Sequence, residues 1–461
     1  MKIRLSEYVD TIRDRKIDVI GVGVSNTPLI IHLLRKGCRL TVRDKSPRDK
    51  LGAVADEIES LGGKLILGDG YLQNINADVI FRTPGLRPDL PQLIKARERG
   101  AVITSEMEVF FEVCPSKIIA VTGSDGKTTT TTIISELLRA AGYNVHLGGN
   151  IGNPLLCEAD AMSREDITVL ELSSFQLMTM RASPHLAVIT NIAPNHLDIH
   201  RDMREYIDAK KNIFLYQKPS DKLVLNADNG IVSALSSEAT GNVMFFSRKI
   251  IPENGICLSD GVICSVTDGV SRPIMYASDI RLPGVHNVEN YMAAFAATFG
   301  LVRPDIQRRV ATEFRGVEHR IEHVRTLRGV EYYNDSIASS PSRTTAGLHS
   351  FDKKVILIAG GKDKGVLFDE LGREIVEHVK TLVVTGYTAD KIAEAVTGAP
   401  GYKGSPDIIR REDFRDAVIA ASESAKEGDI VILSPACTSF DHFRNFAERG
   451  EYFKKIVGEL S

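Results

Sequence analysis

The sequence predicts an α/β protein of three domains, each built on a mostly parallel sheet that helices cover. The first observation is length, because 461 residues exceed what one hydrophobic core usually spans, and two to four domains are expected. The second is that short runs rich in Val and Ile alternate with helical patterns almost throughout. The third is that each run meets a Gly, Ser, Asn or Pro at its C-terminal end, where open α/β sheets place their ligands. The runs are IDVIGVG, KIIAVTG, ITVLELS, HLAVITNI, KVILIAGG, TLVVTG and DIVILSP.

The domain boundaries follow from changes in this pattern. Residues 105–115 precede a glycine-rich loop, and residues 313–322 separate a helical pattern from a new series of strand-like runs. Residues 243–280 turn to short alternating pieces with Gly and Asp turns, which predicts small antiparallel strands inserted in the middle domain. We expect a Rossmann-like first domain, a middle domain of the P-loop ATPase type with a mostly parallel sheet, and a Rossmann-like last domain, at residues 1–108, 109–315 and 316–461.

Composition and charge exclude several classes of protein. Charged residues make up 25%, hydrophobic residues 43%, and the net charge is −3, so no basic excess points to a nucleic-acid partner. The six cysteines form no C-x-x-C pair, so neither a disulfide framework nor a structural metal is indicated. The N-terminus lacks the apolar core of a signal peptide, and no stretch approaches the ~20 apolar residues that cross a bilayer. We expect a cytoplasmic protein that acts on small molecules and does not insert into membranes.

A glycine-rich loop at residues 121–131, VTGSDGKTTTT, has the features of a phosphate-binding loop. It differs from the widespread form G-x-x-x-x-G-K-[ST] because Val121 stands in place of the first Gly. A strand-like run precedes it, and apolar residues at helical spacing follow it. Backbone N–H groups and the positive helix end would face the phosphates, with Lys127 at the terminal phosphates and the Thr128 hydroxyl on Mg²⁺. The alternative is a Gly turn before an ordinary helix. The residues predicted to bind ATP here are Gly123, Ser124, Asp125, Gly126, Lys127, Thr128 and Thr129.

Two neighbouring strand ends carry further groups suited to metal chemistry. ITVLELS contains Glu171 at the tip of a buried run, and a metal on a triphosphate needs such an oxygen ligand. HLAVITNI leads into APNHLDIH, which brings His196 and Asp198 to the same edge if the strands are parallel. A lone Glu at a strand end is more often a solvated loop residue, so Glu171 gains weight only from these neighbours.

Motifs along nearly the whole chain resemble those of the Mur ligase family of ATP-dependent, amide-bond-forming enzymes. The family's phosphate loop is the shortened form T-G-x-x-G-K-[ST], present here at residues 122–128, so the missing Gly is a family trait. ELSSFQL and the last matching stretch most resemble the branch that adds D-glutamate to UDP-N-acetylmuramoyl-L-alanine. The matches, in order, are GGNIG (148–152), ELSSFQL (171–177), NHLD (195–198), YIDAK (206–210), GVHNVEN (284–290), HRIE (319–322), NDS (334–336), AGGKDKG (359–365) and LSPACTSFDHFRNFAERG (433–450).

The resemblance implies a catalytic set made of Lys127, Glu171, His196 and Lys210. Thr128 and Glu171 would hold one magnesium ion, and His196 and a carbamylated Lys210 would hold a second near the substrate carboxylate. Without the resemblance, Lys210 reads as a solvated residue of a helix face.

The resemblance also implies contacts to the rest of ATP. Asn287 and Asn290 would lie at the adenine side, and Arg320 and Asp335, from the third domain, at the phosphates and ribose. The alternatives are a helix cap with a polar helix face for the two asparagines, and surface charges for the other two.

The first domain begins with a dinucleotide-fold pattern. The run IDVIGVGVSN contains the motif G-x-G-x-x-N, with Asn26 in place of the third Gly. A helical pattern, a second strand-like run and Asp44 follow it. On its own this stretch indicates NAD binding. Beside a complete ATP site, the resemblance implies instead a domain that holds the UDP part of a sugar substrate. The implied contacts are Val24 and Ser25 to the diphosphate, Asp44 and Lys45 to the uridine, Gly85 to the uracil edge, Asn150 to the muramoyl side, and His196.

The implied site for the incoming amino acid departs from the family pattern. The family branch commonly reads N-D-S-K-A-T, whereas this chain reads NDSIASS, with Ile337 in place of the Lys and Ser339 in place of the Thr. A desolvated carboxylate needs a charged or hydrogen-bonding partner, and we hypothesise that Arg343, six residues further on, supplies it. The implied amino-acid contacts are Ser339, Arg343, Lys364, Ser439, Phe440 and Phe446.

Alternatives of two kinds stay open from the sequence. The close ones are a sister ligase that adds another amino acid and a folylpolyglutamate-type enzyme. The distant ones are a P-loop switch or motor that hydrolyses ATP and a nicotinamide-dependent dehydrogenase built on the first domain. For the favoured ligase we expect a monomer that uses ATP and two magnesium ions.

Overall fold

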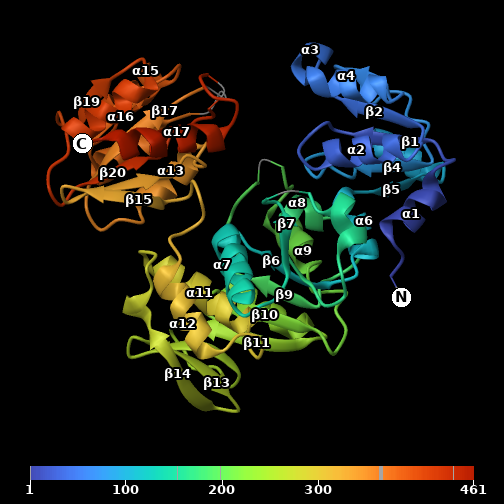
Figure 1. The fold of residues 1–461 in the computed structure, drawn as a ribbon, viewed down its shortest axis with the longest axis horizontal. Helices are drawn as coiled ribbons and strands as arrows, with labels where there is room; N and C mark the ends of the chain where they lie inside the picture. Colours follow the sequence, from blue (N-terminus) through green and yellow to red (C-terminus); the bar gives the residue numbers. More distant parts are fainter. Residues whose placement is uncertain (1, 153, 198, 363–366, 440) are drawn as a thin grey trace. The chain divides into compact units, whose positions relative to one another are not determined.

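The computed structural model describes residues 2–152, 154–197, 199–362, 367–439 and 441–461. These residues form three sheets and divide into two compact units, Met1–Asp279 with His286–Thr312, and Ile280–Val285 with Glu313–Ser461 (Figure 1). The predicted α/β class is therefore confirmed. Each of the three predicted domain ranges contains the strands of one sheet. The boundaries themselves stay a prediction, because the first two ranges share one compact unit.

The first sheet is parallel and has the strand order of a Rossmann fold, β3-β2-β1-β4-β5. Val19 and Phe81 pack with Leu33 on one face, while Ile20 and Ile80 pack with other apolar residues on the opposite face. Burial on both faces explains why these strands read as continuous apolar runs. The strands are β1 (Ile17–Ile20), β2 (Leu40–Asp44), β3 (Lys64–Leu67), β4 (Val79–Arg82) and β5 (Val102–Thr104), and the helices are α1 (Leu5–Ile12), α2 (Asn26–Arg35), α3 (Arg48–Leu51), α4 (Ala53–Ser60) and α5 (Pro91–Glu98).

The central sheet has the strand order β14-β13-β12-β11-β10-β9-β6-β8-β7. Neighbouring strands between the β7 edge and β12 are parallel, whereas β13 is antiparallel to both β12 and β14. Of the strands in residues 243–280, β12 pairs antiparallel with β13 and β13 with β14, as predicted, whereas β11 is parallel to β10 and to β12, so the prediction is wrong for β11. The strands are β6 (Lys117–Thr122), β7 (Val145–Gly149), β8 (Ile167–Glu171), β9 (Leu186–Ile189), β10 (Lys222–Asn226), β11 (Asn242–Ser247), β12 (Gly255–Ser259), β13 (Val262–Thr267) and β14 (Val270–Tyr276). The helices are α6 (Glu106–Val113), α7 (Lys127–Ala140), η1 (Leu156–Ala161), α8 (Ser174–Leu177), α9 (Met203–Lys211), α10 (Gly230–Ala234), η2 (Leu235–Glu238), η3 (Ala277–Asp279), α11 (Val285–Ala297) and α12 (Pro304–Glu313).

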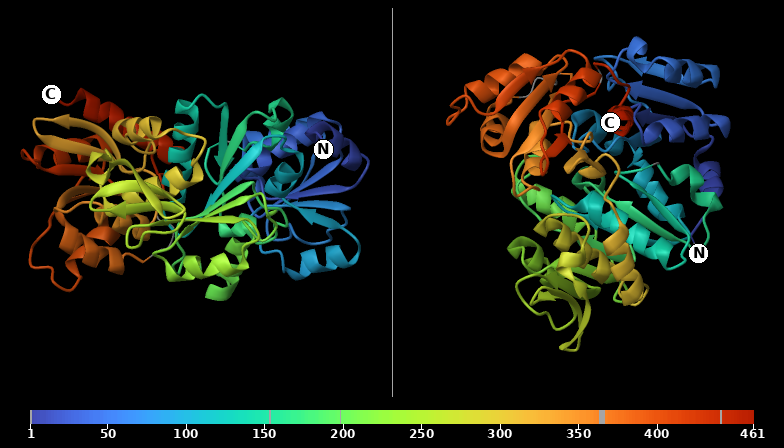
Figure 2. Two further views of the ribbon diagram at one scale, coloured as in Figure 1. Left: turned by 90° about the horizontal axis from the view of Figure 1, so that it is seen from below. Right: turned by 60° about the vertical axis from the view of Figure 1, so that its left-hand side comes forward.

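The third sheet has helices on both faces (Figure 2) and the order β15-β16-β20-β17-β18-β19, with β15 antiparallel to β16. Residues of α13, α14 and α15 pack on one face, and residues of α16 and α17 on the other. The strands are β15 (Glu322–Leu327), β16 (Val330–Asn334), β17 (Val355–Gly360), β18 (Val379–Thr385), β19 (Asp407–Arg410) and β20 (Ile430–Leu433), and the helices are α13 (Pro341–Leu348), α14 (Asp369–His378), α15 (Ala389–Thr397), α16 (Phe414–Glu423) and α17 (Phe446–Glu459).

The apolar core of the first unit runs without a break from the first sheet into the central sheet. Val19 and Phe81 of the first sheet belong to the same cluster as Phe110 of α6 and Leu170 of β8. This continuity explains why the first two predicted domains form one compact unit. In the part of the chain that the structure describes, no helix is both long and apolar enough to span a bilayer.

Candidate active site

The phosphate loop lies between the end of β6 at Thr122 and the start of α7 at Lys127. Gly123 and Gly126 adopt φ angles of 154° and 76°, a region that favours glycine. A Cβ atom on Gly123 would overlap the Thr190 hydroxyl, and one on Gly126 would overlap the side-chain oxygen of Asn290. Both glycines of the motif are therefore required by backbone conformation and by close neighbours.

The segment after β9 holds the loop in place. Asn191 accepts hydrogen bonds from Ser124 N at its carbonyl (2.8 Å) and from Asp125 N at Oδ1 (2.9 Å). The Thr190 hydroxyl donates to the Asp125 carbonyl at 2.6 Å. At the start of α7, the first helix N–H groups have no partner within the helix. This end of the loop is therefore the part suited to binding phosphate.

Lys127, Thr128 and Glu171 come together at this loop, as the sequence predicts. The Lys127 ammonium donates to the carbonyls of Gly123 (2.9 Å) and Ser124 (2.8 Å). The Thr128 hydroxyl donates to Glu171 Oε2 at 2.6 Å, and Asn150 Nδ2 donates to Glu171 Oε1 at 2.7 Å. Glu171 is only 2% exposed, so the alternative of a solvated loop carboxylate is wrong.

Lys210 is buried beneath the same loop. Its ammonium donates to the Gly123 carbonyl at 2.7 Å and to the Thr122 hydroxyl at 3.3 Å, and it lies 4.7 Å from the centre of the Tyr206 ring. Burial, and then the neighbouring Lys127 charge, hold the pKa of Lys210 well below its usual value. The alternative of a solvated helix-face lysine is therefore wrong, and the position favours the neutral amine.

His196 is an exposed residue of the loop between β9 and α9, with a φ of 56°. Its ring meets the edge of Phe175 at 5.2 Å, and Phe175 stacks on His200, also at 5.2 Å. His200 is buried and shares a 2.9 Å hydrogen bond with the Ser174 hydroxyl, so ELSSFQL supports the loop that carries His196. Sequence reasoning missed His200, although its spacing of four from His196 was a usable signal. Asp198 lies outside the described residues.

Asn287 and Asn290 are buried in α11 against the phosphate loop. Asn290 accepts from the Thr130 hydroxyl at 3.2 Å and donates to Asn287 Oδ1 at 3.1 Å. The alternative of a solvated polar helix face is wrong. Together with the position of Asn290 beside Gly126, these bonds connect α11 to the loop.

In the first domain, Asp44 is tied to the glycine-containing turn after β1. Its carboxylate accepts from Val22 N at 2.6 Å and from Ser46 N at 2.7 Å. Asn26 donates to the carbonyls of Ile20 and Gly21, both at 3.1 Å, and so holds the strand end where a third Gly would leave space. The other predicted UDP contacts are surface residues near strand ends: Val24, Ser25, Lys45 and Gly85.

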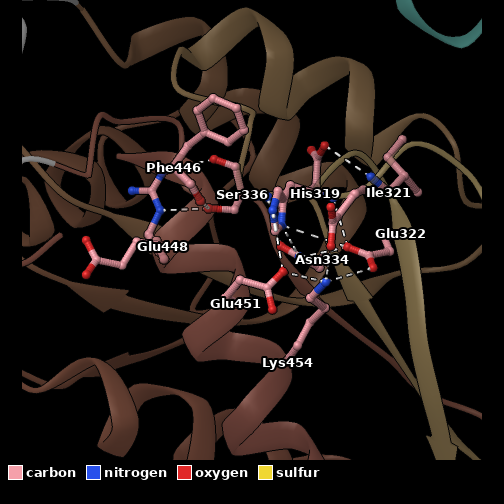
Figure 3. Close-up of polar contacts among 12 residues, drawn as sticks. His319, Ile321, Glu322, Asn334, Ser336, Phe446, Glu448, Glu451 and Lys454 are labelled. Atoms are coloured by element: carbon pink, nitrogen blue, oxygen red, sulfur yellow. Dashed lines mark hydrogen bonds and ion pairs between the residues drawn. The ribbon is translucent and has the colours of Figure 1, made fainter. Parts of the chain in front are cut away.

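In the second unit, HRIE and NDS form one polar network (Figure 3). Asn334 donates to His319 Nδ1 at 2.9 Å and to Glu322 at 3.0 Å. His319 and Ile321 have φ angles of 62° and 46°, so Arg320 lies between two residues of left-handed backbone. Lys454 pairs with Glu318 (2.6 Å), Glu451 (2.7 Å) and Glu322 (3.3 Å), so one ammonium offsets part of the negative charge of the carboxylates around His319.

Asp335 is buried beside this network rather than a surface charge. Ser434 Oγ donates to its carboxylate at 2.7 Å and Ile321 N at 3.3 Å. Burial raises the pKa of Asp335 to about 7.

Phe446 and Arg343, two of the predicted amino-acid contacts of this unit, meet the segment that begins at Ser336. The Ser336 hydroxyl donates to the carbonyl of Phe446, the first residue of α17, and Phe446 meets the edge of His319 at 6.0 Å. Arg343 Nη1 donates to the Ile337 carbonyl at 3.4 Å, which brings the guanidinium beside the residue that replaces the family lysine. The remaining predicted contacts are the partly exposed Ser339 and the buried Ser439, while Lys364 and Phe440 lie outside the described residues.

Sequence reasoning missed Arg449, a buried cation at the same place. Its guanidinium donates to the Ser336 hydroxyl (3.0 Å), the Ser336 carbonyl (2.9 Å) and the Cys437 carbonyl (3.2 Å). Burial lowers the pKa of Arg449 to about 10. Its position in the matching stretch 433–450 was the available signal.

The parallel sheets and the glycine loop at the start of α7 define a nucleotide-binding α/β protein of several domains. The Mur ligase middle domain matches residues 121–298, and the Mur ligase glutamate ligase domain matches residues 319–437. The chain belongs to the Mur ligase family.

Curated relatives match from end to end. The UDP-N-acetylmuramoylalanine–D-glutamate ligase of Acetivibrio thermocellus is 51% identical over 465 residues, with 100% of both chains covered. Enzymes of the same name from Ruminiclostridium cellulolyticum and Clostridium novyi are 49% and 50% identical, again with 100% of both chains covered.

Solved structures share the fold at lower identity. The UDP-N-acetylmuramate-alanine ligase of Thermotoga maritima has a TM-score of 0.59 and 18% identity, with 96% of this chain and 99% of that chain covered. A pseudomurein peptide ligase type C from Methanothermus fervidus has a TM-score of 0.55 and 20% identity, with 97% and 100% covered.

Proposed function

We propose that the chain is an ATP-dependent ligase that joins D-glutamate to UDP-N-acetylmuramoyl-L-alanine in peptidoglycan precursor synthesis. The observation that carries the reaction class is the convergence of Lys127, Glu171 and Lys210 on one phosphate loop. The choice of substrates is supported by relatives of that name that are 51%, 49% and 50% identical over full length.

Mg²⁺ and ATP suit the residues of this loop. The Thr128 hydroxyl and the Glu171 carboxylate are adjacent oxygen donors, which Mg²⁺ prefers, so these two residues would hold one magnesium ion. When bound, ATP would supply the phosphoryl group, and Mg²⁺ would offset the negative charge of the phosphates. The N-terminus of α7 would bind the phosphates, and Lys127, now bonded to loop carbonyls, would turn its ammonium to the terminal phosphate.

A carbamate on Lys210 is the finer part of this proposal. A neutral amine attacks CO₂ and releases a proton, and the lowered pKa of Lys210 provides the neutral form. The buried ammonium is disfavoured by Lys127, whereas a carbamate is an anion that Lys127 would stabilise. With His196, this oxygen ligand would hold a second magnesium ion.

The reaction then needs two steps that the chain's own groups can support. An oxygen of the acceptor carboxylate attacks the γ-phosphorus and releases ADP, which leaves an acyl phosphate. The amine of D-glutamate attacks the acyl carbon, so the amide bond forms while phosphate and a proton leave. Lys127 and the helix end stabilise the charge that develops on the transferred group.

Arg343 is proposed to bind a carboxylate of D-glutamate in place of the family lysine, because its guanidinium lies beside Ile337. We expect Arg343→Ala to raise the KM for D-glutamate at least about tenfold, since a charge-assisted pair is removed, with little change in the KM for ATP. Arg411→Ala, an exposed arginine of the same unit, is the control. An unchanged KM for D-glutamate would refute this role.

The direct test is phosphate release with ATP, UDP-N-acetylmuramoyl-L-alanine and a panel of amino acids. We expect release to depend on the acceptor and to be fastest with D-glutamate. A different preferred amino acid would identify a sister ligase, and release without any amino acid would identify an ATPase. A monomeric state and a cytoplasmic location remain further proposals, and light scattering on the purified chain tests the first.

A further inference from the structure

Three metal-ligating side chains meet on the surface of the second unit, and none of them belongs to the proposed active site. His349 follows the last residue of α13, while Glu374 and His378 lie four residues apart on α14. Nε2 of His349 lies 2.6 Å from Oε2 of Glu374, and Nε2 of His378 lies 3.7 Å from the same oxygen. The three ligand atoms all lie within 4.8 Å of one another.

The backbone that carries these side chains is anchored in the core. Leu348, Ile375 and Val379 are the immediate chain neighbours of the three residues, and all are at most 1% exposed in one apolar cluster. The side chains themselves are partly open, at 51% for His349, 30% for Glu374 and 28% for His378. The arrangement thus combines rigid attachment with access for an ion and for water.

An ordinary surface ion pair explains the contact of one histidine with Glu374 but not the contact of the second. One protonated imidazole would satisfy Glu374, yet both Nε2 atoms approach the same carboxylate oxygen, and the ring centres are 4.7 Å apart. Two protonated imidazoles so close would repel, whereas a shared cation would attract all three donors. Both histidines also stand at the C-terminal ends of helices, where the helix dipole favours positive charge.

We propose that His349, Glu374 and His378 bind a Zn²⁺ ion that fastens α13 to α14, with water at the open position. Two imidazoles and one carboxylate are a ligand set that zinc accepts and magnesium does not prefer. Bond lengths of about 2.0–2.2 Å place tetrahedral ligands roughly 3.4 Å apart. The observed separations of 2.6 and 3.7 Å from Glu374 bracket that value, so small side-chain rotations suffice.

Zinc titration of the full-length protein by calorimetry, with Mg²⁺ in excess, tests the site. We expect one equivalent of Zn²⁺ bound in the wild type, and binding at least about tenfold weaker in His349→Ala and His378→Ala, because each variant loses a ligand. Glu377→Gln, an exposed neighbour on α14, should bind as the wild type does. Co²⁺ in place of Zn²⁺ should give tetrahedral visible absorption bands that both histidine variants lose.

Thermal unfolding gives a second readout. Zn²⁺ should raise the Tm of the wild type and of Glu377→Gln. It should leave the Tm of Glu374→Gln unchanged, and the similar size of the Gln and Glu side chains preserves packing in this variant. Equal zinc affinity in wild type and both histidine variants, or no saturable binding in the wild type, would overturn the proposal.

Discussion

At the scale of single residues, two neighbouring lysines show how burial changes chemistry. Lys211, the last residue of α9, pairs with Glu238 at 2.5 Å. Lys210 is 1% exposed, and its ammonium donates to the Gly123 carbonyl of the phosphate loop. The same charged group is thus an ion-pair partner at one position and a group with a lowered pKa at the next. Local sequence does not distinguish them.

We predict that Lys210→Ala lowers kcat by about 10²–10³-fold, as expected for loss of one stabilising group in a catalytic site. Lys211→Ala should stay within about twofold of the wild type in kcat, because its ammonium pairs with Asp208 and Glu238 rather than with the phosphate loop. Removing CO₂ and bicarbonate should reduce activity reversibly, and mass spectrometry of crystals should find the adduct on Lys210. Full activity of Lys210→Ala, or an unmodified and dispensable lysine, would contradict the assignment.

The raised pKa of Asp335 predicts a specific pH dependence of stability. Between pH about 4 and 7 the unfolded chain has lost this proton while the folded chain retains it, so stability falls as pH rises through that window. Asp335→Asn removes the effect. Its free energy of unfolding relative to wild type should increase by about 1–4 kcal/mol from pH 4.5 to 8, as measured by denaturant titration. A flat difference between Asp335→Asn and wild type over this pH range would contradict the burial of Asp335 as a neutral acid.

At the scale of elements, the loop between β6 and α7 depends on its glycines. We predict that Gly123→Ala destabilises the protein by about 1–3 kcal/mol and weakens ATP binding, because φ is 154° and the new methyl group meets Thr190 and the Asn191 backbone. Gly230→Ala, at the open start of α10, is the matched control. Denaturant unfolding and nucleotide titration measure both effects, and ATP affinity equal to that of the wild type would count against this account of the loop.

The strands along the chain, the phosphate loop and the helix that follows this loop could be predicted, because each has a local sequence signal. Apolar runs mark the strands, and Gly123, Gly126 and Lys127 mark the turn into α7. Other features could not be predicted, because they depend on packing between distant positions. Asn290 meets the helix after the loop through Thr130, 160 positions earlier in the chain, and Arg449 reaches Ser336 across 113 positions. No local pattern encodes such pairs.

At the scale of the whole molecule, the proposed contacts of the reactants are distributed over the three sheets. The region of the first sheet carries most of the proposed UDP contacts, that of the central sheet carries the phosphate loop together with Asn150 and His196, and that of the third sheet carries the proposed amino-acid contacts together with Arg320 and Asp335 for ATP. Relatives named UDP-N-acetylmuramoylalanine–D-glutamate ligase match this chain over 100% of their own length. Ligation is therefore expected of the complete chain, and ATP alone should be hydrolysed slowly.

The central claim is that this chain activates a carboxylate by phosphorylation before the amide bond forms. UDP-N-acetylmuramoyl-L-alanine labelled with oxygen-18 in its carboxylate tests this most directly, with mass analysis of the phosphate released in the presence of ATP and D-glutamate. The account predicts one labelled oxygen in each phosphate, because the carboxylate oxygen that attacks phosphorus leaves with it. Unlabelled phosphate released together with the amide product would contradict the account.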